Sequence, residues 1–358
     1  MMTKGLVCVD QTISLRETLM SIAPNGTKTP TLKDVAAKAN VSPFTVSVAL
    51  NGSKSNTRLS ESTRKRIEEA AEELGYRPNG LARALRNRQT NIIGLYFGYG
   101  HLEPHDPFHA EILTGLQKGC EATQKDLMIH YSFHRYGVEE VFSELVSGKI
   151  DGLVLLAAPK DPLVAKVKAS GLAVVAMTDA IEGLPSVIVD DESGSCAIAA
   201  HLAAKGHKRV MYRTVPGPSD SAERRYNAFK ICAESLGMEI FPVTTSDWKG
   251  SLSQEEQDLV QRRKEMGITA AVCWGDPSAN ALLKFCNSHE IRVPDELAIV
   301  GFNGIEPSVE PARHLTSVRA YWSEVACRAI LNLVDRLEGK PVPMLTVLAT
   351  DFVIGDTA

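Results

Sequence analysis

The sequence TLKDVAAKANVSPFTVSVALN, residues 31–51, has the spacing of two short helices joined by a tight turn. Thr31 stands at an N-cap position with Asp34 three residues later, the arrangement of a capping box. Ser42 stands at a second N-cap, and Pro43 follows at the first helical position, where its missing N–H costs little. This pattern favours a helix-turn-helix, whose second helix lies in the DNA major groove. An ordinary helical hairpin is the alternative that these residues alone leave open.

The second helix of this pair would present several groups to DNA. Phe44 and Val48 are apolar where solvent is expected, and such side chains can read a thymine methyl group. Thr45 and Ser47 can bond to phosphates or base edges, although some of these side chains can instead cap or pack. The candidate DNA contacts of this region, including two cations in the polar loop at 52–58, are Thr31, Ser42, Pro43, Phe44, Thr45, Ser47, Val48, Asn51, Lys54 and Arg58.

A third amphipathic helix and a short basic segment follow. Residues 60–74, SESTRKRIEEAAEEL, have helical spacing, and residues 74–86 read LGYRPNGLARALR. Together with TLKDVAAKANVS, TVSVALN and the strand NIIGLYF, this order resembles the lactose-repressor and purine-repressor (LacI/GalR) family. The resemblance covers all but about the first thirty residues, and it implies a homodimeric, DNA-binding transcriptional regulator.

Residues 79–86 form a segment too short to be a stable helix on its own. In the family that this chain resembles, the segment folds when two chains meet on DNA, and a leucine opens a base step in the minor groove. The motif match assigns this wedge to Leu85 and implies a pseudo-palindromic operator, whereas the alternative for Leu85 is a core leucine. The further DNA contacts implied around the hinge are Tyr76, Asn79, Ala82, Arg83 and Arg86.

Charge is distributed unevenly along the 358 residues. The formal net charge is −4, but residues 31–90 hold eleven Lys and Arg against six Asp and Glu, and residues 91–358 hold a net −10. A basic small domain joined to an acidic large one suits a nucleic-acid contact on the first. A solvated helix face explains Lys65 and Arg66, but it explains the series Arg83, Arg86 and Arg88 less well.

From residue 91 onward, short apolar runs alternate with helical segments, which predicts two doubly wound α/β lobes. The family resemblance implies a periplasmic-binding-protein-like pair, with the chain crossing between lobes near 178–182, 318–321 and 346–348. Ligand would then bind in the cleft, at the carboxyl ends of the strands. After the first, NIIGLYF at 91–97, the expected strands lie at 127–131, 152–156, 172–177, 210–213, 239–243, 270–274 and 297–301.

We therefore predict a multidomain fold: a small all-α helix-turn-helix headpiece, plus an α/β periplasmic-binding-protein-like effector domain of two doubly wound lobes. The expected domains are a flexible N-terminal leader at 1–30, the headpiece at 31–76, the hinge at 77–90 and the effector-binding and dimerisation domain at 91–358. The N-lobe is expected at about 91–179 and 319–346, and the C-lobe at about 180–317 and 347–358.

Four residues are candidates for effector contacts. Arg225 matches a family arginine that holds a sugar hydroxyl or a carboxylate, and Phe108 matches an aromatic position that stacks on ligands. Asn303 stands where the family usually has Asp, which puts the usual bidentate sugar contact in doubt. Asp276 follows a strand, where it can bind ligand or cap the next helix.

The loop GHLEPHDPFH at 100–109 holds three histidines at four-residue steps, His101, His105 and His109. On a helix that spacing would suggest a metal site, but Pro104 and Pro107 break a helix. An effector pocket or a plain loop is therefore favoured over a metal site, and we expect neither a metal nor a cofactor.

Composition and motifs argue against several other classes. Seven scattered cysteines without CxxC spacing indicate reduced thiols in a cytoplasmic protein, mostly as core fillers. No apolar run reaches membrane-spanning length, and the start MMTKGLVCVDQ is too weak for a signal peptide. GxGxxG, Walker A and GxSxG motifs are missing, so nucleotide chemistry and serine-hydrolase chemistry are unsupported.

The sequence thus predicts a cytoplasmic, homodimeric transcription factor, a repressor with no catalytic residues. Its operator affinity is expected to respond to a sugar or related metabolite bound between the lobes, which would change the spacing of the two hinges. One alternative is a solute-binding or sugar-handling protein on the same two lobes. Another is a nonspecific architectural DNA-binding protein.

Overall fold

The computed structural model describes residues 29–51, 59–87, 89–100, 102–103, 105–129, 137–305 and 313–358. The chain separates into two compact units, Met1–Arg88 and Gln89–Ala358, which are described one at a time. Nearly all of the expected leader at 1–30 lies outside the described residues, as do Lys54 and Arg58.

The first unit is built from short helices, α2 (Leu32–Ala39), α3 (Pro43–Asn51), α4 (Glu61–Leu74) and α5 (Gly80–Asn87). The α2 helix ends at Asn40 in the left-handed conformation, and this allows the tight turn into α3. Small and branched side chains form the shared core of α2, α3 and α4, namely Val35, Ala36, Ala39, Val46, Ala49, Ile67, Ala70 and Ala71. These helices confirm the predicted helix-turn-helix and the third helix behind it.

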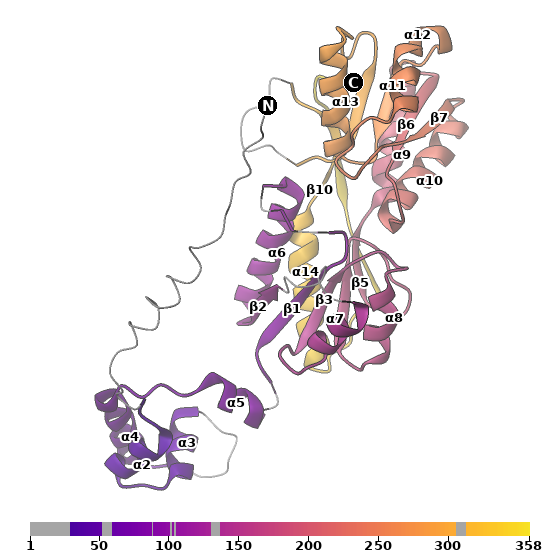
Figure 1. The fold of residues 1–358 in the computed structure, drawn as a ribbon. Helices are drawn as coiled ribbons and strands as arrows, with labels where there is room; N and C mark the ends of the chain where they lie inside the picture. The colour runs from indigo at the N-terminus through magenta and orange to yellow at the C-terminus, as the bar shows by residue number, and fades with distance from the viewer. Residues whose placement is uncertain are drawn as a thin grey trace, which may run out of the picture. The chain divides into compact units, whose positions relative to one another are not determined.

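The second unit consists of two α/β lobes (Figure 1). In the described residues, the N-lobe sheet has six strands in the order β11-β5-β4-β3-β1-β2, all paired in parallel. Its strands are β1 (Ile92–Phe97), β2 (Asp126–Ile129), β3 (Gly152–Leu156), β4 (Ala173–Met177), β5 (Ser186–Val189) and β11 (Leu345–Leu348). The central strand β3, GLVLL, is buried throughout, as expected for a parallel strand with helices on both faces.

The described C-lobe sheet also has six strands, in the order β12-β10-β9-β8-β6-β7. All its pairings are parallel except the antiparallel pairing of β12 with β10 at the edge. Its strands are β6 (Arg209–Thr214), β7 (Glu239–Thr244), β8 (Ala270–Cys273), β9 (Ala298–Asn303), β10 (Thr316–Ala320) and β12 (Thr350–Val353). The two sheets confirm the predicted pair of doubly wound lobes.

The helices pack on both sheets. The N-lobe carries α6 (Pro107–Thr123), α7 (Val138–Leu145), α8 (Pro162–Ala169) and α14 (Trp322–Leu337), and the C-lobe carries α9 (Asp191–Ala204), α10 (Asp220–Ser235), α11 (Gln254–Gln261), α12 (Arg263–Met266) and α13 (Asp276–Ser288). Gly115 and Gly119 let α6 approach α14 closely, because a Cβ at either position would overlap α14. Within the described ranges, no helix combines the length and the apolar character needed to cross a bilayer.

The predicted lobe boundaries need one correction. The strand β5 lies in the N-lobe sheet between β4 and β11, so the N-lobe extends to Val189 rather than to residue 179. The second crossing falls between β10 and α14, as expected, and the third falls at residue 349 between β11 and β12. The prediction lacks β5 because this strand has only four residues and pairs on one side with β11, which comes from the far end of the chain.

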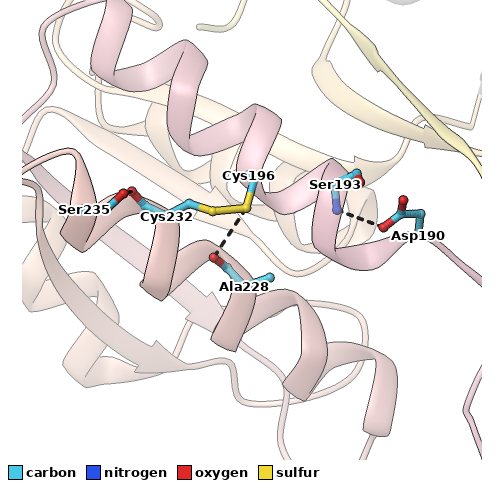
Figure 2. Close-up of a disulfide and its surroundings, with 6 residues drawn as sticks. All are labelled: Asp190, Ser193, Cys196, Ala228, Cys232 and Ser235. Atoms are coloured by element: carbon cyan, nitrogen blue, oxygen red, sulfur yellow. Dashed lines mark hydrogen bonds between the residues drawn. A yellow bond between two sulfur atoms is a disulfide. The ribbon is translucent and has the colours of Figure 1, made fainter.

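The seven cysteines do not all remain thiols, so that prediction is wrong for one pair. Cys196 of α9 and Cys232 of α10 form a disulfide with their Cα atoms 5.5 Å apart (Figure 2). The spacing of 36 residues carries no motif, and only the side-by-side packing of the two helices brings the sulfur atoms together. Cys120, Cys273 and Cys286 are buried thiols, as core fillers should be.

Reduction of this disulfide is expected to destabilise the C-lobe. In the loop-entropy model, a bridge across 36 residues stabilises the folded state by at most about 3 to 4 kcal/mol. Urea unfolding with and without a phosphine reductant measures the effect. The Cys232→Ser variant should unfold at lower urea and lose its response to reductant, whereas Cys327→Ser, which removes a free thiol, should keep it. If the urea midpoint of the unmodified chain is the same with and without reductant, the disulfide does not stabilise the fold.

Candidate functional site

A cavity of about 330 Å³ lies between the two lobes of the second unit. Its walls come from the carboxyl ends of β1, β3 and β4 in the N-lobe and of β8 and β9 in the C-lobe, where open α/β sheets bind ligands. The lining residues are Phe97, Tyr99, Gly100, Glu103, Asp106, Phe108, His109, Leu156, Thr178, Asp179, Ser219, Ser221, Arg225, Trp248, Lys249, Trp274, Pro277, Asn303 and Trp322.

Aromatic rings form most of the apolar wall. All three tryptophans of the chain, Trp248, Trp274 and Trp322, line the cavity. The ring of Trp248 lies 5.4 Å from that of Tyr99 and 5.6 Å from that of Trp274, while Phe108 packs edge-on against Trp322 at 5.1 Å. Such walls suit a ligand with flat apolar faces.

Arg225 is the main polar group of the wall, and it is 3% exposed. Its Nε donates to Oδ1 of Asp191 at 2.7 Å, and its Nη1 donates to the carbonyl oxygen of Trp274 at 2.8 Å. The guanidinium also lies 3.7 Å from the centroid of the Phe302 ring. A buried charge requires such pairing, so the side chain is held in one orientation before any ligand arrives.

Asn303 lies beside Arg225 at the end of β9. Its Oδ1 accepts from Nε1 of Trp322 at 3.2 Å and from Nη1 of Arg225 at 3.4 Å. Asn303 has a φ of 110° and Thr178, also in the lining, has a φ of 73°. Positive φ is costly for side chains other than glycine and is often found where a ligand site requires it.

The carboxylate of Asp179, at the junction of the two lobes, accepts hydrogen bonds from within the protein. Tyr99 donates its hydroxyl to Oδ2 of Asp179, and the backbone N–H of Ser221 donates to Oδ1 at 2.8 Å. Burial and the nearby Asp179 carboxylate raise the pKa of Tyr99 well above its ordinary value, so the phenol stays protonated as the donor. Through Asp179, these bonds join the N-lobe segments that follow β1 and β4 to the start of α10 in the C-lobe.

Three of the four predicted effector residues, Phe108, Arg225 and Asn303, come together in this lining, and Asp276 does not. Asp276 neither caps α13, whose N-cap is Gly275, nor reaches the cavity. Its carboxylate accepts from Oγ of Ser317 at 2.6 Å and from the N–H of Ile305 at 3.1 Å. Asp276 is the first residue of α13, and its carboxylate therefore links the start of this helix to β10 and to the segment after β9.

Sequence analysis missed most of this cavity, including Trp248, Tyr99 and Asp179. One signal was available in the scarce tryptophans, because Trp274 is the last residue of the predicted strand at 270–274 and Trp248 follows the predicted strand at 239–243. The contribution of the 245–253 loop could not be inferred, since it depends on how that loop folds back across the C-lobe.

Burial raises the pKa of Asp276 from its ordinary 3.8 to about 6, despite the hydrogen bonds from Ser317 and Ile305. The folded chain thus holds this proton more tightly than the unfolded chain. The resulting stability is fully present below about pH 4 and is lost as the pH rises through about 6, with a size of about 3 kcal/mol.

The Asp276→Asn variant has no such titration. Its free energy of unfolding, relative to that of the unmodified chain, is expected to rise between pH 4 and pH 6 and to stay constant above. Urea unfolding at half-unit pH intervals measures this difference. A difference that does not change with pH would contradict the raised pKa.

The histidine loop contributes to the cavity through His109. Its Nδ1 accepts the backbone N–H of Glu103 at 3.0 Å, so the neutral ring carries its proton on Nε2. Asp106 caps α6 by accepting the N–H of Phe108 at 2.8 Å, which orients the first turn of α6 toward the cavity. His101 lies outside the described residues. The described residues contain no group of three His, Cys, Asp or Glu side chains placed to hold a metal ion.

In the headpiece, the predicted caps are confirmed. Thr31 donates its backbone N–H to Asp34 at 2.7 Å, and the N–H of Thr45 donates to Oγ of Ser42 at 3.1 Å. Pro43 is the first residue of α3. Phe44 is 62% exposed, which leaves a large apolar ring on the surface where a base edge can meet it.

Val48 does not share that exposure. It was predicted on the exposed side of α3, but it is 6% exposed. The carboxyl half of this nine-residue helix is largely buried, and the exposed side chains among its described residues, Pro43 and Phe44, lie in the first turn. The side chain of Asn51 lies outside the described residues.

Six of the predicted DNA contacts border one groove of about 530 Å³ in the first unit. The groove brings the start of α2 and the middle of α3 next to the segment that leads into α5. Asn79 accepts the N–H of Ala82 at 3.2 Å and so begins α5. The six residues are Thr31, Ser47, Tyr76, Asn79, Ala82 and Arg83.

Leu85 is 84% exposed on α5, so it is not a core leucine of this unit. Ala82 and Arg83 are also exposed, whereas the side chain of Arg86 lies outside the described residues. Leu85 is also not part of the apolar core that α2, α3 and α4 share. The geometry is that expected of a side chain that inserts between bases.

Comparison with known proteins agrees with this arrangement. Residues 31–79 match the family model described as bacterial regulatory proteins, lacI family. Residues 101–247 match periplasmic binding proteins and sugar binding domain of LacI family, and residues 199–358 match a periplasmic binding protein-like domain. The chain belongs to the LacI/GalR family. It is therefore a DNA-binding transcriptional regulator with a ligand-binding domain.

Curated relatives of this LacI/GalR regulator include two from Escherichia coli strain K12. The HTH-type transcriptional repressor CytR is 28% identical over 322 residues, which cover 87% of this chain and 91% of CytR. The HTH-type transcriptional regulator GalR is 26% identical over 324 residues, which cover 88% of this chain and 92% of GalR. The match spans both the headpiece and the two lobes.

Solved structures show the same fold. The lac repressor dimer bound to operator and the anti-inducer ONPF has a TM-score of 0.77 at 22% identity, covering 92% of this chain and 99% of that one. The complex of the transcriptional regulator CelR with cellobiose has a TM-score of 0.65 at 25% identity, covering 92% and 100%.

Proposed function

We propose that this LacI/GalR regulator is a sequence-specific repressor whose operator affinity is set by a small molecule bound in the cavity between the lobes. The observation that carries the proposal is the composition of that cavity. Three tryptophans and a buried, pre-oriented arginine meet at the carboxyl ends of strands from both lobes. A molecule bound there would contact both lobes at once, so it can favour one lobe arrangement over another.

The effector is a ring-shaped metabolite, a sugar or a related compound. Flat aromatic walls can stack on a ring, and the Arg225 fork can bond to hydroxyl or carboxylate oxygens. At Asn303 an amide replaces the carboxylate usual in the family, and its Oδ1 already accepts from Trp322 and Arg225. This position therefore offers an amide N–H₂ donor rather than a carboxylate acceptor to the ligand.

Two chains act together on DNA. The headpiece at 31–76 and the hinge at 77–90 of each chain bind one half of a pseudo-palindromic operator, with Phe44 in the major groove and Leu85 in the minor groove. Effector binding changes the angle between the lobes, which alters the spacing of the two hinges and so the operator affinity. We place the protein in the cytoplasm as a homodimer, consistent with this role and with relatives that are named as transcriptional regulators rather than enzymes.

Selection from a randomised duplex pool at physiological salt tests the proposal, with sequencing of the bound DNA. We expect an enriched palindrome around a central pyrimidine–purine step, because such steps kink easily. Tryptophan fluorescence then screens sugars and related metabolites, since all three tryptophans line the cavity. Enrichment of no sequence, together with tight sugar binding, would support the solute-binding alternative instead. A steep salt slope without sequence preference would support architectural binding.

A further inference from the structure

A fully buried ion pair lies in the C-lobe outside the cavity lining. Arg213, at the end of β6, and Glu256, in the first turn of α11, are each 0% exposed. The Nε of Arg213 donates to Oε1 of Glu256, and its Nη2 donates to Oε2 at 3.2 Å. Burial of two charges is costly even when they are paired, so the pair calls for an explanation beyond stability.

The other hydrogen bonds of Arg213 go to two backbone carbonyl oxygens and, at 4.0 Å, to Sγ of Cys273. Its Nη2 donates to the carbonyl oxygen of Gly250 at 2.8 Å, and its Nη1 donates to the carbonyl oxygen of Ser278 on α13. One guanidinium thus joins three separate parts of the C-lobe: the first turn of α11, the first turn of α13 and the loop at 245–253, which we call the Trp248 loop. A planar fork with five donors can satisfy these acceptors together, whereas a lysine ammonium cannot match their geometry.

The Trp248 loop has a defined shape of its own. The N–H of Ser246 donates to the carbonyl oxygen of Ser251 at 2.9 Å, and the N–H of Ser251 donates to Oδ1 of Asp247 at 3.0 Å. Gly250 has a φ of 78°, and a Cβ there would overlap the backbone of Ser278. The loop is therefore pressed directly onto α13, at the point where Arg213 binds it.

The opposite side of the loop reaches across the cavity to the N-lobe. Trp248 packs against the ring of Tyr99 at 5.4 Å, and Nζ of Lys249 lies 3.3 Å from the carboxylate of Glu103. Lys249 and Glu103 are well exposed, with side chains 76% and 53% accessible. Exposed ion pairs contribute little, so this end of the loop can separate easily while the buried end stays attached.

Within the cavity, the Trp248 loop meets the indole of Trp274. The ring of Trp274 lies edge-on to that of Trp248, with the ring centroids 5.6 Å apart. The loop thus contacts the cavity wall and the N-lobe through ring packing and one exposed ion pair, whereas the buried hydrogen bonds of Arg213 hold its other end.

From these contacts we propose that Arg213 and Glu256 are positioning residues that hold the Trp248 loop as a gate over the cavity. The buried pair is the fixed end, and the contacts of Trp248 and Lys249 with Tyr99 and Glu103 are the end that releases. This inference rests on the proposed function only where it gives the gate a role in effector binding. The bracing of the loop and the covering of the cavity stand independently of any ligand.

The test replaces the pair by apolar residues in the full-length chain. The double variant Arg213→Met, Glu256→Leu removes both charges together, which buried pairs often tolerate without loss of stability. Hydrogen exchange measured by mass spectrometry should show the 245–253 segment exchanging about tenfold faster, with the rest of the C-lobe unchanged. Acrylamide quenching of tryptophan fluorescence should increase about twofold, because the cavity tryptophans lose their cover.

The matched control is another ion pair of the same lobe, Arg263 with Glu296. Nη2 of Arg263 lies 3.3 Å from Oε1 of Glu296, and this pair lies outside the Trp248 loop. Arg263→Met, Glu296→Leu should leave loop exchange and quenching unchanged. Equal effects from both double variants would mean a general loss of C-lobe stability and would overturn the bracing. Unchanged loop exchange in the Arg213 and Glu256 variant would overturn it as well.

A second variant tests the releasing end even if the Arg213 and Glu256 variant does not fold. The double variant Tyr99→Ala, Lys249→Ala removes both contacts of the loop with the N-lobe and leaves the buried pair intact. Quenching should rise while the Gly250 and Ser251 amides keep their slow exchange. Unchanged quenching would overturn the gate. None of the exchange and quenching experiments uses DNA or an effector. A failed operator selection would therefore leave their results valid, and results that contradict the gate would leave the repressor proposal valid.

Discussion

The Leu85→Ala variant is expected to bind the selected operator about 100-fold more weakly and random duplex DNA almost as well as before. Leu85 is 84% exposed, so its truncation removes no core contact. Its proposed role is to open a base step, which lets the DNA bend and touch more of both headpieces. Loss of the wedge therefore affects the specific complex, whereas nonspecific binding depends on phosphate contacts that remain.

Fluorescence anisotropy with operator and random duplexes at two salt concentrations measures both affinities. Leu345→Ala is the control, since Leu345 is a 50% exposed leucine in the other unit. It should change neither affinity. Parallel losses on operator and random DNA in Leu85→Ala would contradict the wedge, because that pattern indicates damage to the headpiece.

The Arg225→Lys variant is expected to lose effector affinity by about 100-fold while keeping operator binding. The guanidinium of Arg225 bonds to Asp191, to the Trp274 carbonyl oxygen and to Asn303 in one plane, and an ammonium keeps the charge but not this geometry. Retaining the charge keeps a cation beside Oδ1 of the buried Asp191, whose other oxygen is paired with Arg224.

Tryptophan fluorescence titration with the compound found in the metabolite screen measures this loss. Arg224→Lys is a close control, because Arg224 also bonds to Asp191, at 2.7 Å, but does not line the cavity. Thermal unfolding confirms that both variants fold. If the two variants lose effector affinity equally, the effect comes through Asp191 and the packing of α9 on α10, and Arg225 does not contact the effector.

Prediction from the sequence succeeded where the signal is local. The caps at Thr31 and Ser42 need only neighbouring residues, and the predicted strand at 152–156 agrees with β3 at both ends. It failed where the structure depends on distant partners. Val48 was placed on the wrong side of α3, and Asp276 was offered to the effector although its carboxylate serves Ser317 and Ile305.

By itself, the sequence determined the helix-turn-helix, the family and the two-lobed plan, because periodicity, caps and motif order are properties of short segments. Only the tertiary structure decided which side chains meet. The tryptophans at 248, 274 and 322, the ion pair of Arg213 with Glu256, and the disulfide of Cys196 with Cys232 each join residues at least 26 positions apart. Such contacts depend on strand order and on how helices cross, and these are set by the packing of the whole lobe rather than by any local pattern.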